Sequence, residues 1–245
     1  MLKQAALYLD EDKRLQSARS LELGALHNLR SNLRYYYKSN KSTCLKDSID
    51  RFSEFMTKMN EAKTIQELMT IEARARQLYF QMFNEIIHEE RFRFIQRTKM
   101  PPRDPLNALI SFGNTYIYNR VATEISKTSL DLRIGFLHSL TNRNQSLNLD
   151  IAEIFKQLIV DRTIFTIINK RMINTNDHFE KTEDNGIYLN RAGKRLYIKE
   201  LDSKIYSKRV EGNQAANYDS LIRDEIMKIY RLVWADEKSK PYKYK

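Results

Sequence analysis

The chain has 245 residues, of which 42 are Lys or Arg and 31 are Asp or Glu, giving a formal net charge of +11. Its 6 Gly and 4 Pro are too few for the turns of a mainly stranded protein, so the composition predicts an all-α fold. The single Cys44 excludes an internal disulfide and a cysteine zinc site.

No run of residues reaches the roughly 20 apolar positions of a membrane span, and the first residues do not resemble a signal peptide. With the lone cysteine, this favours a soluble protein of the reducing cytoplasm. The sequence shows no repeat, no Gly/Ser linker and no break in composition. We therefore predict one helical domain over 1–245, with a basic and frayed tail at about 236–245.

Helices are expected from the first residues onward. Apolar side chains recur at helical spacing over 11–38, and a second amphipathic helix is predicted at 45–59. The third helix begins at Thr64, which forms a T-x-x-E capping box with Glu67, and is expected to reach about residue 95.

The second half of the chain continues the helical pattern. A strongly apolar helix is predicted at 104–125, with Asp104 as the N-cap and Pro105 in the first turn, where its missing N–H is harmless. A turn, a short helical piece and a polar loop follow. The last helices are expected at about 147–172, from near 191, and at 218–234.

Positive charge is concentrated at 91–109 and 191–209, where Tyr and Phe are interleaved with Lys and Arg. Such clusters suit a phosphate backbone, because cations bind the phosphates while rings pack on sugars or bases. The alternative for any single Lys or Arg is an ordinary solvated helix face. The excess as a whole favours a polyanionic partner.

One histidine and two acids form the most suggestive local group. His138 ends the stretch GFLH, and Asp150 and Glu153 lie three residues apart, so both acids share a helix face. An imidazole with converging carboxylates suits Mg²⁺ or Mn²⁺. The alternatives are a satisfied core histidine and acids that offset a helix dipole. Glu72 alone reads as an ordinary surface glutamate.

Several motifs in a fixed order resemble the CRISPR adaptation integrase family, the CRISPR-associated, metal-dependent DNA endonucleases that insert new spacers. The resemblance covers about 5–235. Its motifs are IEARARQLYF (71–80), PPRDPLNALISFGN (101–114), IGFLHS (134–139), SLNLDIAEIF (146–155) with IVDR (159–162), and LNRAGKRLYIKELDSKIY (189–206).

The resemblance implies the multi-helix catalytic domain of that family. The family carries a β-rich domain ahead of these helices, and no strand-rich segment stands in that place here, so we expect a shortened form without the N-terminal β-domain. That domain is associated with dimerisation in the family, so a homodimer is implied for the full-length proteins. DNA and a small ferredoxin-like CRISPR-associated protein are the implied partners.

By resemblance, Glu72, His138 and Glu153 become the ligands of Mg²⁺ or Mn²⁺. Asp150 becomes an acidic neighbour that coordinates directly, coordinates through water, or orients a ligand. The implied activity is DNA cleavage, and spacer insertion by attack of a 3′-hydroxyl on a phosphodiester. The alternative is a non-catalytic helical DNA-binding or assembly module derived from the family.

Four arginines are candidates for DNA contacts near such a site, because carboxylates beside a phosphate need compensating positive charge. They are Arg74, Arg76, Arg103 and Arg143. The alternative for each is a salt bridge to the acids of the chain itself.

Overall fold

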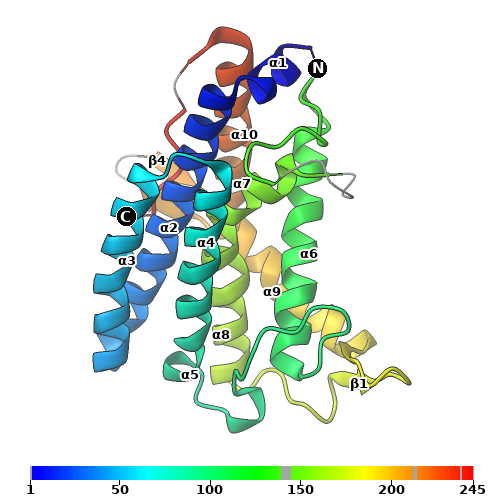
Figure 1. Cartoon of the computed structure of the whole chain (residues 1–245). Coiled ribbons are helices and arrows are strands. Elements are labelled where there is room, and N and C mark those ends of the chain that lie inside the picture. Colours follow the sequence, from blue (N-terminus) through cyan, green and yellow to red (C-terminus); the bar gives the residue numbers. More distant parts are fainter. Residues whose placement is uncertain (1, 139–144, 212–213, 238, 245) are drawn as a thin grey trace.

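The computed structural model describes residues 2–138, 145–211, 214–237 and 239–244 (Figure 1). The all-α prediction is confirmed, since the strands in these ranges form only two short antiparallel hairpins. The helices are α1 Leu2–Leu9, α2 Glu11–Asn40, α3 Thr43–Glu61, α4 Ile65–Gln81, α5 Phe83–Ile86, α6 Pro105–Ile125, α7 Leu147–Lys156, α8 Arg162–Asn169, α9 Arg191–Tyr206 and α10 Tyr218–Ala235. The hairpins pair β1 Phe179–Lys181 with β2 Ile187–Leu189, and β3 Arg209–Glu211 with β4 Gln214–Ala216.

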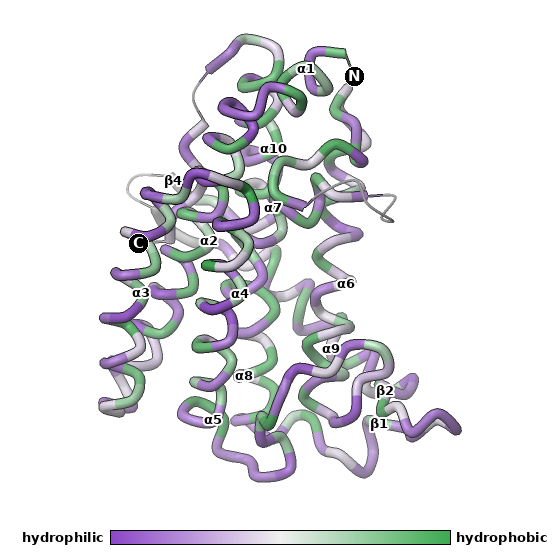
Figure 2. The backbone as a smooth tube through the Cα atoms, in the orientation of Figure 1, coloured by the Kyte–Doolittle hydropathy of each residue, from purple (hydrophilic) through white to green (hydrophobic). Residues whose placement is uncertain are grey.

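Helix α2 is the central element of the bundle, and it packs against α3, α4 and α7 (Figure 1). Its inward face carries small and apolar residues at helical spacing, among them Ala18, Ala25, Leu29 and Leu33, all buried. Figure 2 shows hydrophilic and hydrophobic positions alternating along α3 and α4, as expected for amphipathic helices with one face on the core. Among the described residues, no helix is long and apolar enough to cross a membrane.

Helix α4 is shorter than the sequence predicted. Its start is as expected, because the Thr64 hydroxyl accepts a hydrogen bond from the Glu67 amide at 3.1 Å. The expected continuation to about residue 95 is wrong, since α4 ends at Gln81. The chain then reverses, because the Asn84 side chain bonds both the amide and the carbonyl of Phe94, at 2.7 and 2.9 Å.

The predicted helix at 147–172 is one helical run in three parts. α7 and α8 flank a π-helix at Gln157–Asp161. The run ends at Asn169, before the predicted end at residue 172. Buried amides of α2 accompany this irregularity: Asn28 donates to the carbonyl of Ile154 and Asn32 to that of Gln157, both at 3.0 Å. These bonds satisfy carbonyls where the regular ladder is interrupted.

One face of helix α6 packs against α9 and the π-helix, and a neighbouring face lines a cleft. Its N-terminus is as predicted, with the Asp104 carboxylate accepting from the Asn107 amide at 2.7 Å. Gly113 lets α9 and the π-helix approach closely, because a Cβ there would lie 2.4 Å from the Tyr197 hydroxyl and 2.5 Å from Val160 Cγ1. The next face of α6, carrying Ser111, Asn114 and Tyr118, is left to line a cleft.

The C-terminal segment is docked rather than frayed, so the expected loose tail is wrong for residues 239–244. The Tyr242 ring is 8% exposed and stacks on Phe155, with 5.7 Å between centroids. Asn28 donates to the Tyr242 carbonyl at 3.0 Å and accepts from the Tyr244 amide at 2.7 Å. The sequence suggested fraying because the charges are exposed, whereas buried rings and amide bonds hold the segment.

Replacing Tyr242 by alanine tests this docking. Tyr242→Ala should lower the free energy of unfolding by about 2–4 kcal/mol, because a buried ring and its stacking are lost. Urea unfolding followed by circular dichroism measures the change. Tyr188→Ala is the matched control, since that ring is 38% exposed and its loss should cost less than about 1 kcal/mol. Equal small losses for both variants would contradict a docked tail.

Candidate active site

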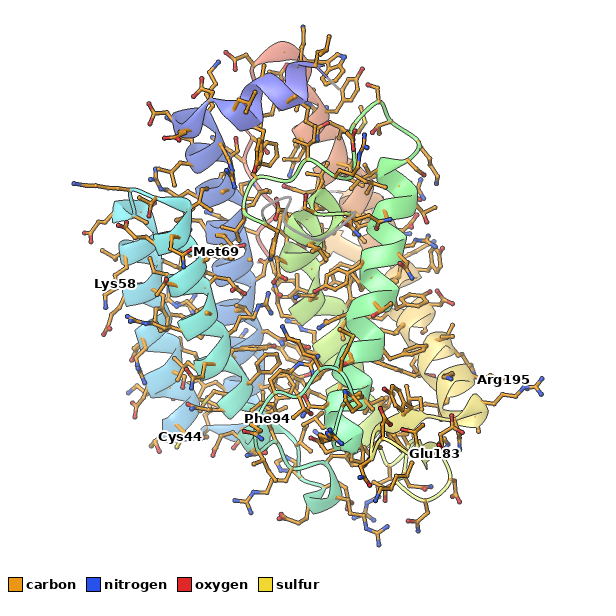
Figure 3. The ribbon with its side chains drawn as sticks, turned by 45° about the vertical axis from the view of Figure 1, so that its right-hand side comes forward. Cys44, Lys58, Met69, Phe94, Glu183 and Arg195 are labelled. Atoms are coloured by element: carbon orange, nitrogen blue, oxygen red, sulfur yellow. The ribbon has the colours of Figure 1, made fainter. Side chains whose placement is uncertain are left out.

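The three residues implied as metal ligands line one cleft of about 850 Å³ between α4, α6, α7 and the segment 94–100. Glu72 comes from α4, Glu153 from α7, and His138 from the loop that precedes α7. Figure 3 labels Met69 on α4 and Phe94 beyond α5, two residues on the cleft wall. The fold therefore brings together residues 81 positions apart in the sequence.

Asp150 organises the loop that carries His138. Its carboxylate is buried and accepts from the amides of Phe136, Leu137 and His138 at 2.5, 3.1 and 3.2 Å. The loop can approach this closely because residue 135 is glycine, and a Cβ there would lie 2.7 Å from Asp150 Oδ2.

The same carboxylate sets the orientation of the His138 ring. Nδ1 of His138 lies 2.6 Å from Oδ1 of Asp150. Because an ionised carboxylate only accepts, this geometry places the hydrogen on Nδ1 and leaves the lone pair on Nε2. A carboxylate behind a histidine is the usual support of a metal-binding imidazole. Of the three roles open for Asp150, the geometry favours orientation.

Glu72 and Glu153 are held by cations of the chain itself. Nε of Arg76 lies 2.8 Å from Oε1 of Glu72, and the same guanidinium forms an ion pair with Glu153. Lys156 pairs with Glu153 from the other side and contacts the Tyr118 hydroxyl at 3.1 Å. Each of these two acids thus has a positive partner within the chain.

In the part of the chain that the structure describes, no three His, Cys, Asp or Glu side chains converge as a ready metal-binding group. Arg76 instead bridges Glu72 and Glu153. The donor types still fit Mg²⁺ or Mn²⁺, with two carboxylates and one oriented imidazole facing a common cleft. A divalent cation would therefore exchange with ion pairs that already hold these oxygens.

A further acid, Glu22, escaped the sequence analysis. It lies on α2, is 1% exposed, and has an Oε1 atom with no hydrogen-bond partner among the described residues. Burial, and then the charge of Glu72, raise its pKa to about 8. A signal did exist, because Glu22 falls inside the apolar stripe of α2 between Ala18 and Ala25.

Other cleft residues were also missed. Tyr118, Arg97, Lys99 and Lys156 all line the cleft. Burial and then the positive charge of Arg76 lower the pKa of Lys156. Burial acts to raise the pKa of Tyr118, but the charge and hydrogen bond of Lys156, with the charges of Arg76 and Lys99, together outweigh it, and the net pKa is lowered. Arg97 and Lys99 belong to the basic cluster at 91–109, and Lys156 lies three residues after Glu153, so only Tyr118 had no sequence signal.

The four arginines predicted to contact DNA have different environments. Arg76 forms the salt bridges that were its alternative. Arg103 donates to the Asp184 carbonyl at 2.7 Å and so anchors the loop between β1 and β2. Arg74 is exposed on α4, and Arg143 lies outside the described residues. Their contacts with DNA stay a prediction.

The sequence matches the family model described as "CRISPR associated protein Cas1" over residues 1–203. It is 42% identical over 244 residues to "CRISPR-associated endonuclease Cas1 2" of Thermodesulfovibrio yellowstonii, covering 99% of this chain and 73% of that protein. A solved Cas1 protein from Thermotoga maritima superposes with a TM-score of 0.83 at 36% identity, covering 95% of this chain and 69% of the other.

Two further solved structures share the fold at lower identity. A casposase bound to an integration product has a TM-score of 0.86 at 18% identity, covering 98% of this chain and 70% of that one. A chain of a partial Cas6-RT-Cas1--Cas2 complex has a TM-score of 0.87 at 22% identity, with 99% and 72% covered. These two similarities show a shared fold and nothing more.

The role of Asp150 can be tested by stability. Asp150→Ala should lower the free energy of unfolding by at least about 3 kcal/mol, because three buried amides lose their acceptor. Asp150→Asn keeps one acceptor oxygen in the same place and should lose less than half as much. Denaturant unfolding in EDTA measures both variants. Equal losses would show that the carboxylate is not the loop's anchor.

The raised pKa of Glu22 predicts a pH dependence of stability. Below about 4.5, the ordinary pKa, the group is protonated in both states and its contribution is fully present. As the pH rises toward 8, the unfolded chain loses the proton first, so the free energy of unfolding falls by up to about 1.4 kcal/mol per pH unit.

Glu22→Gln should flatten this slope between pH 5 and 8 in EDTA, as measured by urea unfolding at unit intervals. Glu90→Gln is the control, because its side chain is 82% exposed and the slope should match that of the unmodified protein. A steep slope that persists in Glu22→Gln would assign the proton to another group.

Proposed function

The chain belongs to the CRISPR associated protein Cas1 family, and on that premise we propose that it is a metal-dependent DNA endonuclease and integrase. The observation that supports this most is the shared cleft, in which Glu72, Glu153 and an oriented His138 face one another. We propose that these three hold Mg²⁺ or Mn²⁺ and that Asp150 fixes the imidazole.

The proposed substrate is a DNA phosphodiester. A bound divalent cation would neutralise the phosphate and polarise its P–O bond. The 3′-hydroxyl of an incoming DNA end is the nucleophile in integration, and water is the nucleophile in cleavage. Lys156, once released from Glu153, would add positive charge beside the phosphate.

The cleft can also receive a backbone away from the acids. Lys99 is exposed on its rim, and Arg97 is held in the wall by the Asn107 and Ser111 side chains, at 2.7 and 2.9 Å. Fixed cations of this kind position a polyanion without selecting a base sequence.

The proposed partners follow from the relatives. The casposase is seen with an integration product, and the Cas1 chain of the partial complex is seen with Cas2. We propose that this chain likewise acts on DNA from a CRISPR array with a small CRISPR-associated partner, the ferredoxin-like protein implied by the sequence. The homodimer implied for the full-length family stays a prediction.

Activity tests this proposal directly. His138→Ala should reduce Mn²⁺-dependent cleavage and integration of branched DNA by at least about 100-fold, because the imidazole ligand is lost. Product formation is followed on labelled oligonucleotides with the purified chain. His88→Ala is the matched control, because that histidine is exposed and does not line the cleft. Equal activity of the two variants would contradict the proposal.

The second candidate function is a non-catalytic DNA-binding or assembly module. The observation in its favour is that Arg76 and Lys156 already neutralise Glu72 and Glu153. Such a module would bind DNA with a steep dependence on salt but yield no product with Mn²⁺. Binding and cleavage assays on the same preparation distinguish the two.

A further inference from the structure

We propose that Glu22 is a positioning residue of the cleft: it receives the guanidinium of Arg76 when a divalent cation takes the carboxylates of Glu72 and Glu153. This assignment rests on the proposed function. It gives a role to a buried acid that the proposed reaction leaves unused.

Glu22 sits in the closed interior at the junction of three helices. Arg19 of α2 donates to the carbonyl of Ala62, the residue that caps the C-terminus of α3. Gln157 donates to the Ala25 carbonyl at 3.4 Å, which joins α2 to the π-helix after α7. The charged groups facing Glu22 are Glu72, Arg76, Asp150 and Lys156.

Other buried acids of the described chain have evident partners. Asp150 accepts from three amides, and Asp219 pairs with arginines. Glu124 pairs with a lysine and an arginine, and Glu225 with Lys228 and the Tyr242 amide. For Glu22 there is no such bond in the described residues. A buried carboxyl without a partner is destabilising, so its presence beside the cleft requires a reason.

Arg76 supplies that reason, because it is enclosed and both of its partners belong to the proposed ligand set. Its side chain is 13% exposed. A divalent cation that took Glu72 and Glu153 would leave this guanidinium buried without a counter-charge, which is strongly unfavourable. Glu22 and Asp161 are the remaining acids that face it.

Glu22 is better placed than Asp161 to receive the guanidinium. Asp161 already shares a hydrogen bond with Tyr79, whereas Oε1 of Glu22 is open among the described residues. Lys156 differs from Arg76, because it still donates to the Tyr118 hydroxyl at 3.1 Å when Glu153 leaves. The exchange therefore concerns Arg76 and Glu22.

Calorimetric titration of the metal-free chain with MnCl₂ tests the assignment without recourse to activity. Glu22→Gln should weaken Mn²⁺ binding by about 10–100-fold, the usual cost of losing an outer partner of a metal site. Glu225→Gln is the matched control, since it is also a buried glutamate with an unpartnered oxygen but lies on α10, away from the cleft. The Mn²⁺ affinity of Glu225→Gln should stay within about twofold of that of the unmodified protein.

A double-mutant cycle separates positioning from a general structural effect. In an Arg76→Gln background no guanidinium needs an acceptor, so adding Glu22→Gln should change the Mn²⁺ affinity by less than about twofold. Thermal unfolding in EDTA checks the fold of each variant, and Glu22→Gln should melt no lower than the unmodified protein. If Glu22→Gln does not fold, Glu22→Asp replaces it, with weakened Mn²⁺ binding again expected from the shorter reach.

The outcomes are distinguishable. If the unmodified chain binds no Mn²⁺, the proposed metal site fails, and the role of Glu22 fails with it. If it binds Mn²⁺ and Glu22→Gln binds equally well, only the role of Glu22 is overturned. The role is also overturned if Glu22→Gln weakens binding as strongly in the Arg76→Gln background, because Glu22 would then act independently of Arg76.

Discussion

The geometry of the cleft depends on a single buried carboxylate, that of Asp150. It collects three consecutive amides of the loop before α7 and orients the ring of His138. A loop without regular secondary structure has no backbone hydrogen-bond partners for its N–H groups. The Asp150 carboxylate, from the neighbouring helix, accepts from these N–H groups instead. The placement of an imidazole opposite α4 is thus a consequence of backbone satisfaction in the core.

Charge in the cleft is balanced inside the chain. Arg76 and Lys156 form ion pairs with the two glutamates. The same cations compete with any metal for those oxygens, so binding becomes an exchange of partners. Two further acids, Glu22 and Asp161, are buried, and burial raises the pKa of each and so favours its neutral form. In the proposed metal site, affinity would then depend also on residues that do not touch the metal.

The frame that holds these groups is stabilised by polar contacts as well as apolar packing. A single side chain of α2, that of Asn28, bonds both α7 and the C-terminal segment. Its partners are the carbonyls of Ile154 and Tyr242 and the amide of Tyr244. Such fully satisfied amides specify one arrangement of helices, because any shift would leave buried donors unpaired. The π-helix between α7 and α8 is tied to α2 in the same way, because Asn32 donates to the Gln157 carbonyl at 3.0 Å.

Local patterns in the sequence were sufficient for the helical class and for the starts of α4 and α6. The family resemblance, not a local pattern, named Glu72, His138 and Glu153 together, and the structure places all three on one cleft. Capping and periodicity depend on neighbours within a few positions, which the sequence shows directly. The early end of α4 was not predicted, because the Asn84 side chain bonds the backbone of Phe94 and hydrophobic periodicity carries no information about such bonds.

Only the tertiary structure decided how the charges are paired. Glu22 and Arg76 are 54 residues apart, and nothing in either local context tells that they face one another across α2 and α4. The docking of the tail likewise depends on Asn28 and Phe155, far away in the chain. Sequence determined which groups carry charge and which helices carry them, because those are local properties. The pairing of charges and the burial of side chains depend on contacts between distant segments, so they arise only once the helices have packed.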